Sequence, residues 1–396
     1  MKKDRFNVNA HLHTPYSFSA FRDIDDALDR AVAEEVKVVG INDFYTARGY
    51  EEWAKGCEKR SLYPLFGIEF IALDQEDQAA GLRVNDPANP GRTYLSGKGL
   101  AYPFKLDEPH ASRLEAVRQE ANKQVKEMCG KLNELLAREK VGFTLDFDWI
   151  TNELTKGLVR ERHLAKVLRI KLFEFHEKDE GKVNLTLETL FGGKVLKAPL
   201  HDVAAIENEI RANLLKVGGA AFVPEEAAAF LPVEAVRQTI IAAGGIPTYP
   251  FLADDPNGNY TDFEKDPQQA ARRLTERGFH SVEFITTRND VRLLERYASY
   301  LHEQGFVVTL GSEHNTPVME PIELFARGGV PLSDRLKQIN SEGASVIAAH
   351  QHVVSQGLDG YVDESGEADR SRRDEFVKLG DEVIRSRINA AQAKLE

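Results

Sequence analysis

Two histidines lie two residues apart near the start of the chain, at His11 and His13. From Phe6 onward the residues alternate between apolar and polar, which is typical of a β-strand. Residues two apart in a strand project from the same face, so these two imidazoles can present themselves to one divalent metal ion. A pair of this kind is weak evidence alone, because such pairs also arise by chance as structural residues.

Other acidic and imidazole side chains stand at the ends of later predicted strands. Glu69 lies near the end of the apolar run LYPLFGIEFIAL, and Glu313 and His314 end the run FVVTLGSEH. The C-terminal ends of parallel strands meet at one rim of a barrel, where ligands gather. Buried carboxylates beside imidazoles are costly unless a cation neutralises them. The pattern therefore predicts a metal site at this rim.

The elements that must position these side chains follow a βα rhythm. Predicted strands at 6–13, in VKVVGIND and in LYPLFGIEFIAL are separated by helices that start at Asp23 and cover about 50–60. After a helix-rich middle, strands return in GGIPTYPF, HSVEFI and FVVTLGSEH, with helices at 266–277 and 289–304 between them. Alternation of this kind predicts parallel strands with right-handed crossovers, hence an α/β barrel or doubly wound sheet.

The order of predicted strands and helices divides the chain into four segments. The first part of the barrel covers 1–105, a helix-rich insertion 106–243, the second part of the barrel 244–320, and a C-terminal helical extension 321–396. The insertion begins with a long helix, from PHASRLEAV to KLNELL, that carries one apolar stripe.

Composition restricts the function. A net charge of −12 argues against contact with extended nucleic acid, which needs a positive face, although a few basic residues suffice for one small anionic substrate. The N-terminus lacks an apolar run of signal-peptide length and no stretch of membrane-spanning length is present, so we expect a cytoplasmic protein without membrane contact. Cys57 and Cys129 are too few for a disulfide framework or a thiolate metal site. Homo-oligomerisation is left open.

At these positions the sequence resembles the PHP superfamily, the polymerase and histidinol phosphatase fold, over most of its length. HLHT is similar to the HxH motif that opens the family, INDF to TDH, FGIEF to GxE and GSEHN to GSDxH. RERHLAKVL resembles the RPHxA motif of a branch that hydrolyses nucleotide phosphates and short RNA, and GGIPTYP resembles GGxxxxHP with Tyr249 for the histidine. The resemblance implies a distorted (β/α)7 barrel with divalent metal ions at the strand ends.

Three positions depart from the family pattern together. The aspartate expected shortly after HxH falls at Phe18, the histidine of TDH at Phe44, and the last histidine of GSDxH at Asn315. In the family these side chains hold one of three ions, so the resemblance implies that this ion is absent. A second ligand set survives, with Glu for Asp, at His11, His13, Glu69 and Glu313.

The remaining ion of the family would use Glu69 and His163, which makes these two the candidate catalytic residues. A further family histidine has no clear counterpart; His110 would reach the site only if its loop folded back. His314 would bind metal only if its loop shifted by one residue. Asp43 is expected to accept a hydrogen bond from a ligand imidazole and not to bind metal itself.

Four basic residues are candidate substrate contacts. Arg160 and Arg162 flank His163, Arg288 follows the strand HSVEFI, and Lys98 lies in PGRTYLSGKG, whose spacing does not fit a Walker phosphate loop.

The leading hypothesis is a metal-dependent phosphoesterase that hydrolyses a small phosphorylated substrate, a nucleotide or a sugar phosphate, with one or two manganese, zinc or iron ions. A second is a diverged metalloenzyme with one or two ions and a carbohydrate-like substrate, favoured by the aromatic rings at Phe18 and Phe44. A third is an inactive binding protein, which the retained ligands oppose.

Overall fold

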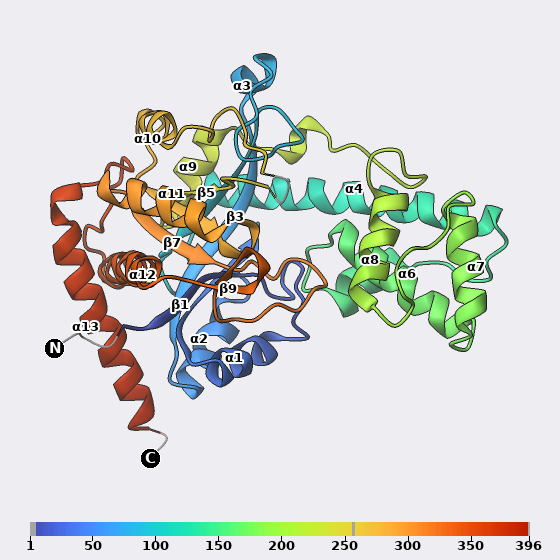
Figure 1. The fold of residues 1–396 in the computed structure, drawn as a ribbon, viewed down its shortest axis with the longest axis horizontal. Helices are drawn as coiled ribbons and strands as arrows, with labels where there is room; N and C mark the ends of the chain where they lie inside the picture. Colours follow the sequence, from blue (N-terminus) through green and yellow to red (C-terminus); the bar gives the residue numbers. More distant parts are fainter. Residues whose placement is uncertain (1–4, 256–257, 395–396) are drawn as a thin grey trace.

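A seven-stranded sheet forms the centre of the molecule in the computed structural model, which describes residues 5–255 and 258–394. The strands follow one another around the sheet in chain order, and Figure 1 shows them with helices packed outside. They are β1 (Asn7–Leu12), β2 (Val36–Phe44), β3 (Tyr63–Leu73), β4 (Arg92–Lys98), β5 (Ile246–Phe251), β6 (Ser281–Ile285) and β7 (Val307–Gly311).

The sheet closes on itself between its first and last strands. Leu12 bridges Glu313 in parallel, and the backbone amides of His13 and Glu313 donate across this junction. A Cβ at Gly311 would lie 2.3 Å from the Cβ of His11, so β7 can approach β1 because this residue is glycine. The predicted distorted barrel is confirmed.

One strand of the barrel was not predicted, and it runs antiparallel to its neighbours. β4 pairs antiparallel with both β3 and β5, whereas the other neighbouring pairs are parallel. Sequence reasoning took this segment for a loop. Because β4 is reversed, its C-terminal end lies at the end of the barrel opposite to the predicted site.

Helices cover the outside of the barrel. Their N-terminal caps are acidic side chains in several cases, such as Asp23 and Asp290, as expected for short polar caps. The helices between strands are α1 (Ile24–Ala33), α2 (Tyr50–Lys59), the short α3 (Gln75–Ala79), α9 (Val233–Ala242), α10 (Pro267–Glu276) and α11 (Val291–Glu303).

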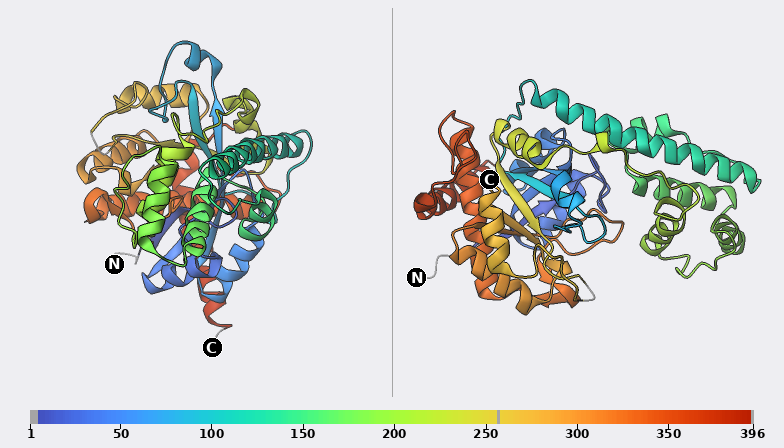
Figure 2. Two further views of the ribbon diagram at one scale, coloured as in Figure 1. Left: turned by 90° about the vertical axis from the view of Figure 1, so that its right-hand side faces the viewer. Right: turned by 90° about the horizontal axis from the view of Figure 1, so that it is seen from above.

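The helical segment between β4 and β5 has a hydrophobic core of its own. α4 (His110–Arg138) runs outward from the barrel, and the other helices pack beside its far half (Figures 1 and 2). These are α5 (Phe147–Trp149), α6 (Glu161–Phe175), α7 (Glu180–Leu190) and α8 (Val203–Ile210). The separate core runs from Val125 to Val223, whereas Val117 near the start of α4 belongs to the barrel core.

After β7 come a two-stranded ribbon, β8 (Phe325–Ala326) and β9 (Val330–Pro331), and two long helices, α12 (Asp334–Val354) and α13 (Arg373–Gln392). α12 covers the N-terminal end of the barrel. Asn340 donates to Val8 O and accepts from Leu310 N, and Gln351 pairs with the backbone at the start of β3. The C-terminal extension therefore closes the barrel opposite the candidate site.

We expect His350 on α12 to make stability pH-dependent. Burial lowers its pKa from 6.5 to about 4, and the ring is held neutral, with Nε2 donating to Gly244 O and Nδ1 accepting from Tyr361 N. Below pH 6.5 the unfolded chain binds a proton that the folded chain does not, so stability falls with falling pH down to about 4. At pH 5 this loss is about 2 kcal/mol.

The measurement is urea unfolding of wild type and His350→Gln at pH 7 and pH 5. The variant should lose about 2 kcal/mol less than wild type between the two pH values, whatever its stability at pH 7. Other titrating groups cancel in this double difference. Equal losses in both proteins would show that His350 is not held neutral.

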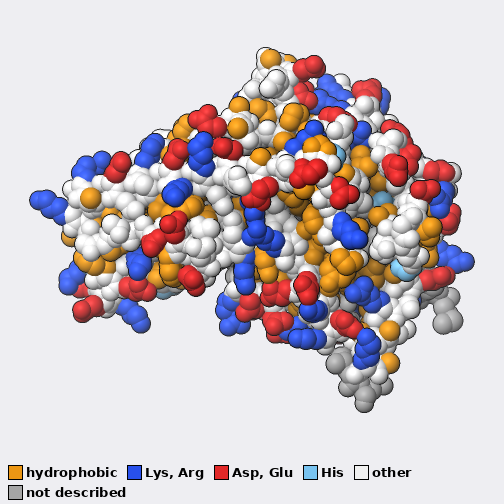
Figure 3. Space-filling model, turned by 180° about the vertical axis from the view of Figure 1, so that it is seen from behind, with side chains coloured by type: hydrophobic (Ala, Val, Ile, Leu, Met, Phe, Trp, Pro, Cys, Tyr) orange, Lys and Arg blue, Asp and Glu red, His pale blue; other side chains and the backbone are white. Residues whose placement is uncertain are grey.

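Seen from behind, the surface carries acidic and basic side chains interspersed, and neither sign covers a continuous face (Figure 3). Among the described residues, no helix combines the length and the hydropathy needed to cross a bilayer.

Candidate metal site

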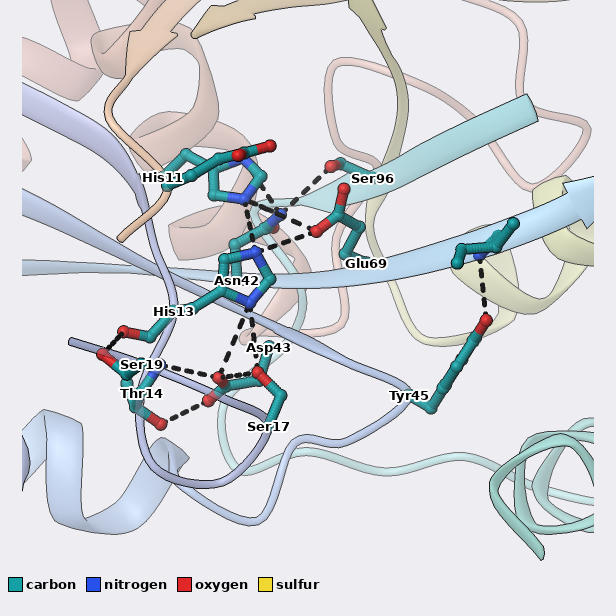
Figure 4. Close-up of polar contacts among 12 residues, drawn as sticks. His11, His13, Thr14, Ser17, Ser19, Asn42, Asp43, Tyr45, Glu69 and Ser96 are labelled. Atoms are coloured by element: carbon teal, nitrogen blue, oxygen red, sulfur yellow. Dashed lines mark hydrogen bonds and ion pairs between the residues drawn. The ribbon is translucent and has the colours of Figure 1, made fainter. Parts of the chain in front are cut away.

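Three ligand-type atoms converge inside the barrel. His11 Nε2 lies 3.1 Å from His13 Nε2 and 3.6 Å from Glu69 Oε2, and His13 Nε2 lies 2.9 Å from the same oxygen (Figure 4). Ligands that share one ion tetrahedrally at about 2.1 Å are about 3.4 Å apart. We name these three residues the His–His–Glu triad. Among the residues that the structure describes, their ligand atoms are the ones that lie close enough together to bind one metal ion.

Strands β1 and β3, which lie on either side of β2, position the triad. The two histidines lie at the end of β1 with both rings directed into the barrel, and Glu69 lies on β3 beside Phe44 of β2. All three triad side chains are buried. This is the meeting of strand ends that the sequence predicted for these three residues.

The outer nitrogens of the two rings are already engaged. His11 Nδ1 lies 2.7 Å from Glu283 Oε1, and His13 Nδ1 lies 3.1 Å from Ser17 Oγ. Ser17 in turn donates to Asp43 at 2.6 Å. With protons on Nδ1, both Nε2 lone pairs face Glu69; this tautomer follows from the hydrogen-bond network.

The predicted role of Asp43 requires one change. Its carboxylate accepts from Thr14 and Ser17 and is 3.9 Å from His13 Nδ1. Asp43 thus reaches the ring of His13 through Ser17 rather than directly.

The triad fits a cation. Glu69 Oε2 is buried and accepts no hydrogen bond of good geometry, although two imidazole nitrogens lie near it. Burial opposes ionisation of both groups, but contacts with the histidines bring the pKa of Glu69 down to about 2, and Glu283 raises the pKa of His11 to about 9. A divalent ion at the triad would supply the positive charge that the buried Glu69 carboxylate attracts.

Two aromatic rings lie at the site, and one of them, Phe44, packs directly on the triad. Phe44 stacks on His13 with ring centroids 5.0 Å apart, and the guanidinium of Arg160 lies 4.5 Å from its centroid. Phe18 packs edge-on against His163 at 4.9 Å, with Arg162 5.8 Å from its ring. These rings stand where the family pattern has ligands and hold two arginines near the site.

A cavity of about 340 Å³ opens over these rings, between the barrel rim and the insertion. Its wall combines Phe18, Phe44 and Tyr94 with arginines and acids. The charged lining residues are Glu69, Asp86, Arg160, Glu161, Arg162, Arg211, Arg288 and Glu313.

Most of the acids in this wall are paired with a base. Glu161 contacts Arg211 at 2.9 Å and Lys216 at 3.1 Å, and Glu313 pairs with Arg288. No carboxylate among the described residues lies within ion-pair distance of Arg162, and burial lowers the pKa of this guanidinium to about 10. Arg162 is therefore the cation in the cavity that most lacks an anion.

The structure does not bring Glu313 and His314 into the triad. β7 ends at Gly311, and both residues have positive φ, so the in-and-out alternation used to place them has already stopped. The carboxylate of Glu313 turns to Arg288. His314 bonds to Ser312 Oγ and Glu320 O, and burial lowers its pKa to about 4.

His163 is likewise separate from Glu69. As the third residue of α6, it accepts the N–H of Arg160 at 2.9 Å, and burial lowers its pKa to about 3. His110 begins α4 on the flank of the barrel and lies 3.2 Å from Thr239 Oγ1. The ring of His163 thus serves the start of α6, and the ring of His110 contacts α9.

We expect His163→Ala to lower the free energy of unfolding by about 1 to 2 kcal/mol, because it removes the acceptor at the start of α6 and a packing partner of Phe18. Metal content should not change. Chemical denaturation and elemental analysis of the same preparation check this. A folded variant without bound metal would restore His163 as a ligand.

Lys98 does not face the cavity. It ends the antiparallel strand β4 and is 2% exposed, with Nζ 2.6 Å from Glu283 Oε2. The predicted contact with substrate is therefore wrong for this residue. Arg160, Arg162 and Arg288 do line the cavity, which leaves their substrate contacts as predictions.

Sequence reasoning missed Glu283, Ser17 and Asn42. Glu283 is fully buried in β6, and Asn42 places Nδ2 3.1 Å from both His11 Nε2 and Ser96 Oγ. A lone glutamate inside the apolar strand HSVEFI was the available signal for Glu283.

Comparisons with known proteins agree with this geometry. Residues 9–173 match the PHP domain family. No curated protein matches the sequence significantly. Among solved structures, a protein from Bifidobacterium adolescentis ATCC 15703, provisionally named a metal-dependent phosphoesterase, aligns with a TM-score of 0.52 at 16% identity over 84% of this chain and 95% of that one.

An amidohydrolase from Chromobacterium violaceum, solved with bound sulfate and no metal, aligns with a TM-score of 0.53 at 16% identity over 84% of this chain and 96% of that one. At this identity the two structures speak for the fold. The similarity to the PHP domain family covers residues 9–173, and the fold and the triad agree with it.

Proposed function

We propose that this protein is a metal-dependent hydrolase that cleaves a phosphate ester in a small substrate, a nucleotide or a sugar phosphate. The observation that carries the proposal is the convergence of three ligand-type atoms, on His11, His13 and Glu69, next to a cavity whose wall includes Glu69 and four arginines. The comparisons support a hydrolase of this superfamily, and the phosphate specificity rests on the cavity wall.

Each part of the site has a role in this proposal. The triad would hold one divalent ion, which would supply activation of water and neutralisation of phosphoryl charge. Arg162 supplies the charge that orients the anionic group, with Arg160 and Arg288 beside it. Phe44 and Phe18 keep bulk water away, which strengthens these electrostatic contacts.

We infer that a single ion binds. Phe18 and Phe44 have no donor atoms, and their rings fill the space next to His13 and His163. His163 directs Nδ1 to the backbone of Arg160. Mixed imidazole and carboxylate ligands suit manganese, zinc and iron, so the choice of ion is a matter for experiment.

The test is phosphate release from a panel of nucleoside and sugar monophosphates by protein equilibrated with manganese, zinc or iron and analysed for metal content. We expect about one ion per chain and turnover of at least one member of the panel. Bound metal with no phosphate release from any phosphorylated compound would contradict the phosphoesterase assignment.

A second candidate function is hydrolysis of a carbohydrate-like substrate without phosphate. The aromatic wall formed by Phe18, Phe44 and Tyr94 favours it, since such rings stack on sugar faces. The same preparation assayed with neutral glycosides and sugar amides or esters distinguishes the two.

A further inference from the structure

A buried lysine lies inside the barrel behind the metal site. Lys98 Nζ is 2.6 Å from Glu283 Oε2 and donates to Ala10 O at 3.0 Å. Lys98 is 2% exposed and Glu283 fully buried. Removing two charges from water is costly, and an apolar pair of similar volume would often be at least as stable. Stability alone is therefore a weak reason for this pair.

The pair is joined directly to the triad. The other oxygen of Glu283, Oε1, lies 2.7 Å from His11 Nδ1, on the side of the ring opposite to the Nε2 atom in the triad. Lys98 thus fixes one oxygen of the carboxylate, and the second is left to receive the imidazole N–H. Its bond to Ala10 O also anchors the backbone next to His11.

We propose that Lys98 and Glu283 are positioning residues for the metal site: the buried ion pair orients the His11 ring and holds its proton on Nδ1, so that Nε2 is presented to the ion. This inference rests on the proposed metal site at the triad. Groups that orient a ligand imidazole in this way commonly change metal affinity by about 10- to 100-fold.

The pair spans the barrel, which makes the positioning rigid. Lys98 comes from β4, Glu283 from β6 and His11 from β1. Because β4 is antiparallel, its last residue, Lys98, enters the interior from beneath the site. The ammonium group of Lys98 therefore does not obstruct the cavity. Solvent does not compete for these contacts, since all three side chains are buried.

The experiment measures binding of Zn²⁺ by competition with a chromophoric chelator, and the visible spectrum of the Co²⁺-loaded protein, without any substrate. Glu283→Gln keeps the shape of the side chain and removes its charge, and Lys98→Met removes the anchor. Lys98→Met leaves a buried carboxylate unpaired, so the double variant Lys98→Met with Glu283→Gln is included in case the single variant does not fold.

We expect Glu283→Gln and the double variant to bind Zn²⁺ about 10- to 100-fold more weakly than wild type and to shift the Co²⁺ absorption bands. The matched control is Arg169→Met, which breaks the pair between the partly buried Arg169 and the buried Glu207 in the insertion. This control should lower thermal stability and leave both metal readouts unchanged.

The outcomes separate the two proposals. Wild-type affinity and spectrum in a folded double variant would overturn the positioning role while leaving the metal site intact. Failure of wild-type protein to bind either ion would overturn the metal site and, with it, the positioning role. Equal weakening by Arg169→Met would show that the effect follows stability and would also overturn the positioning role.

Discussion

Glu69→Gln should abolish stoichiometric metal binding and lower hydrolysis by about 1,000-fold or more. Glu69 is the one carboxylate of the triad, and its Oε2 lies 2.9 Å from His13 Nε2. An amide can turn its oxygen or its NH₂ group to the ion but carries no charge to neutralise it. The side-chain volume is almost unchanged, so the loss reports the charge and not the packing.

The measurement combines elemental analysis with the rate of phosphate release on the best substrate of the panel. Glu207→Gln is the matched control, since it makes the same substitution at a buried glutamate that pairs with Arg169 in the insertion. The control should retain metal and turnover. Retention of both by Glu69→Gln would contradict the assignment of the site.

Arg162→Met should lower kcat/KM for a phosphorylated substrate by about 10- to 100-fold without changing metal content. Arg162 lines the cavity, and among the described residues no carboxylate lies within ion-pair distance of its guanidinium. An anionic substrate would therefore gain a charge-assisted contact that the free protein does not satisfy. Methionine keeps most of the packing against Phe18.

Steady-state kinetics of wild type, Arg162→Met and Arg162→Lys test this. The lysine variant should fall between the other two, because it keeps the charge and loses the planar fork. Arg138→Met, at an exposed position on the insertion, should leave kcat/KM unchanged. A loss for neutral substrates as large as for phosphorylated ones would favour the second candidate function.

The regular parts of the fold could be predicted because local patterns specify them. The alternation before His13 gave β1, and the predicted helices at 266–277 and 289–304 became α10 (Pro267–Glu276) and α11 (Val291–Glu303). Strand ends that share one rim could be compared without knowing the packing, which is why His11, His13 and Glu69 could be predicted as neighbours.

The positions of the other site residues depend on features of the folded chain that residue spacing does not reveal. Lys98 was placed at the rim because the reversed direction of β4 is decided by pairing with distant strands. Glu313 was expected in the triad because its strand was taken to continue, whereas the backbone turns with positive φ at this residue. His163 sits three residues from a helix end whose N–H it accepts, a contact that the motif alone does not reveal.

The supporting groups were missed for a similar reason. Glu283 contacts Nδ1 of His11 from a strand that is distant in the sequence. Ser17 contacts Nδ1 of His13 from the loop that follows β1. Their effect is exerted through geometry in the folded barrel. Position in the sequence gives a candidate ligand, and the contacts of its ring decide which nitrogen is offered to a metal.

The most direct test of the metal site is an anomalous difference map from crystals equilibrated with manganese or zinc. We predict one strong peak per chain, about 2.1 Å from His11 Nε2, His13 Nε2 and Glu69 Oε2. A map without a peak at the triad, or with the ion bound elsewhere in the chain, would contradict the account.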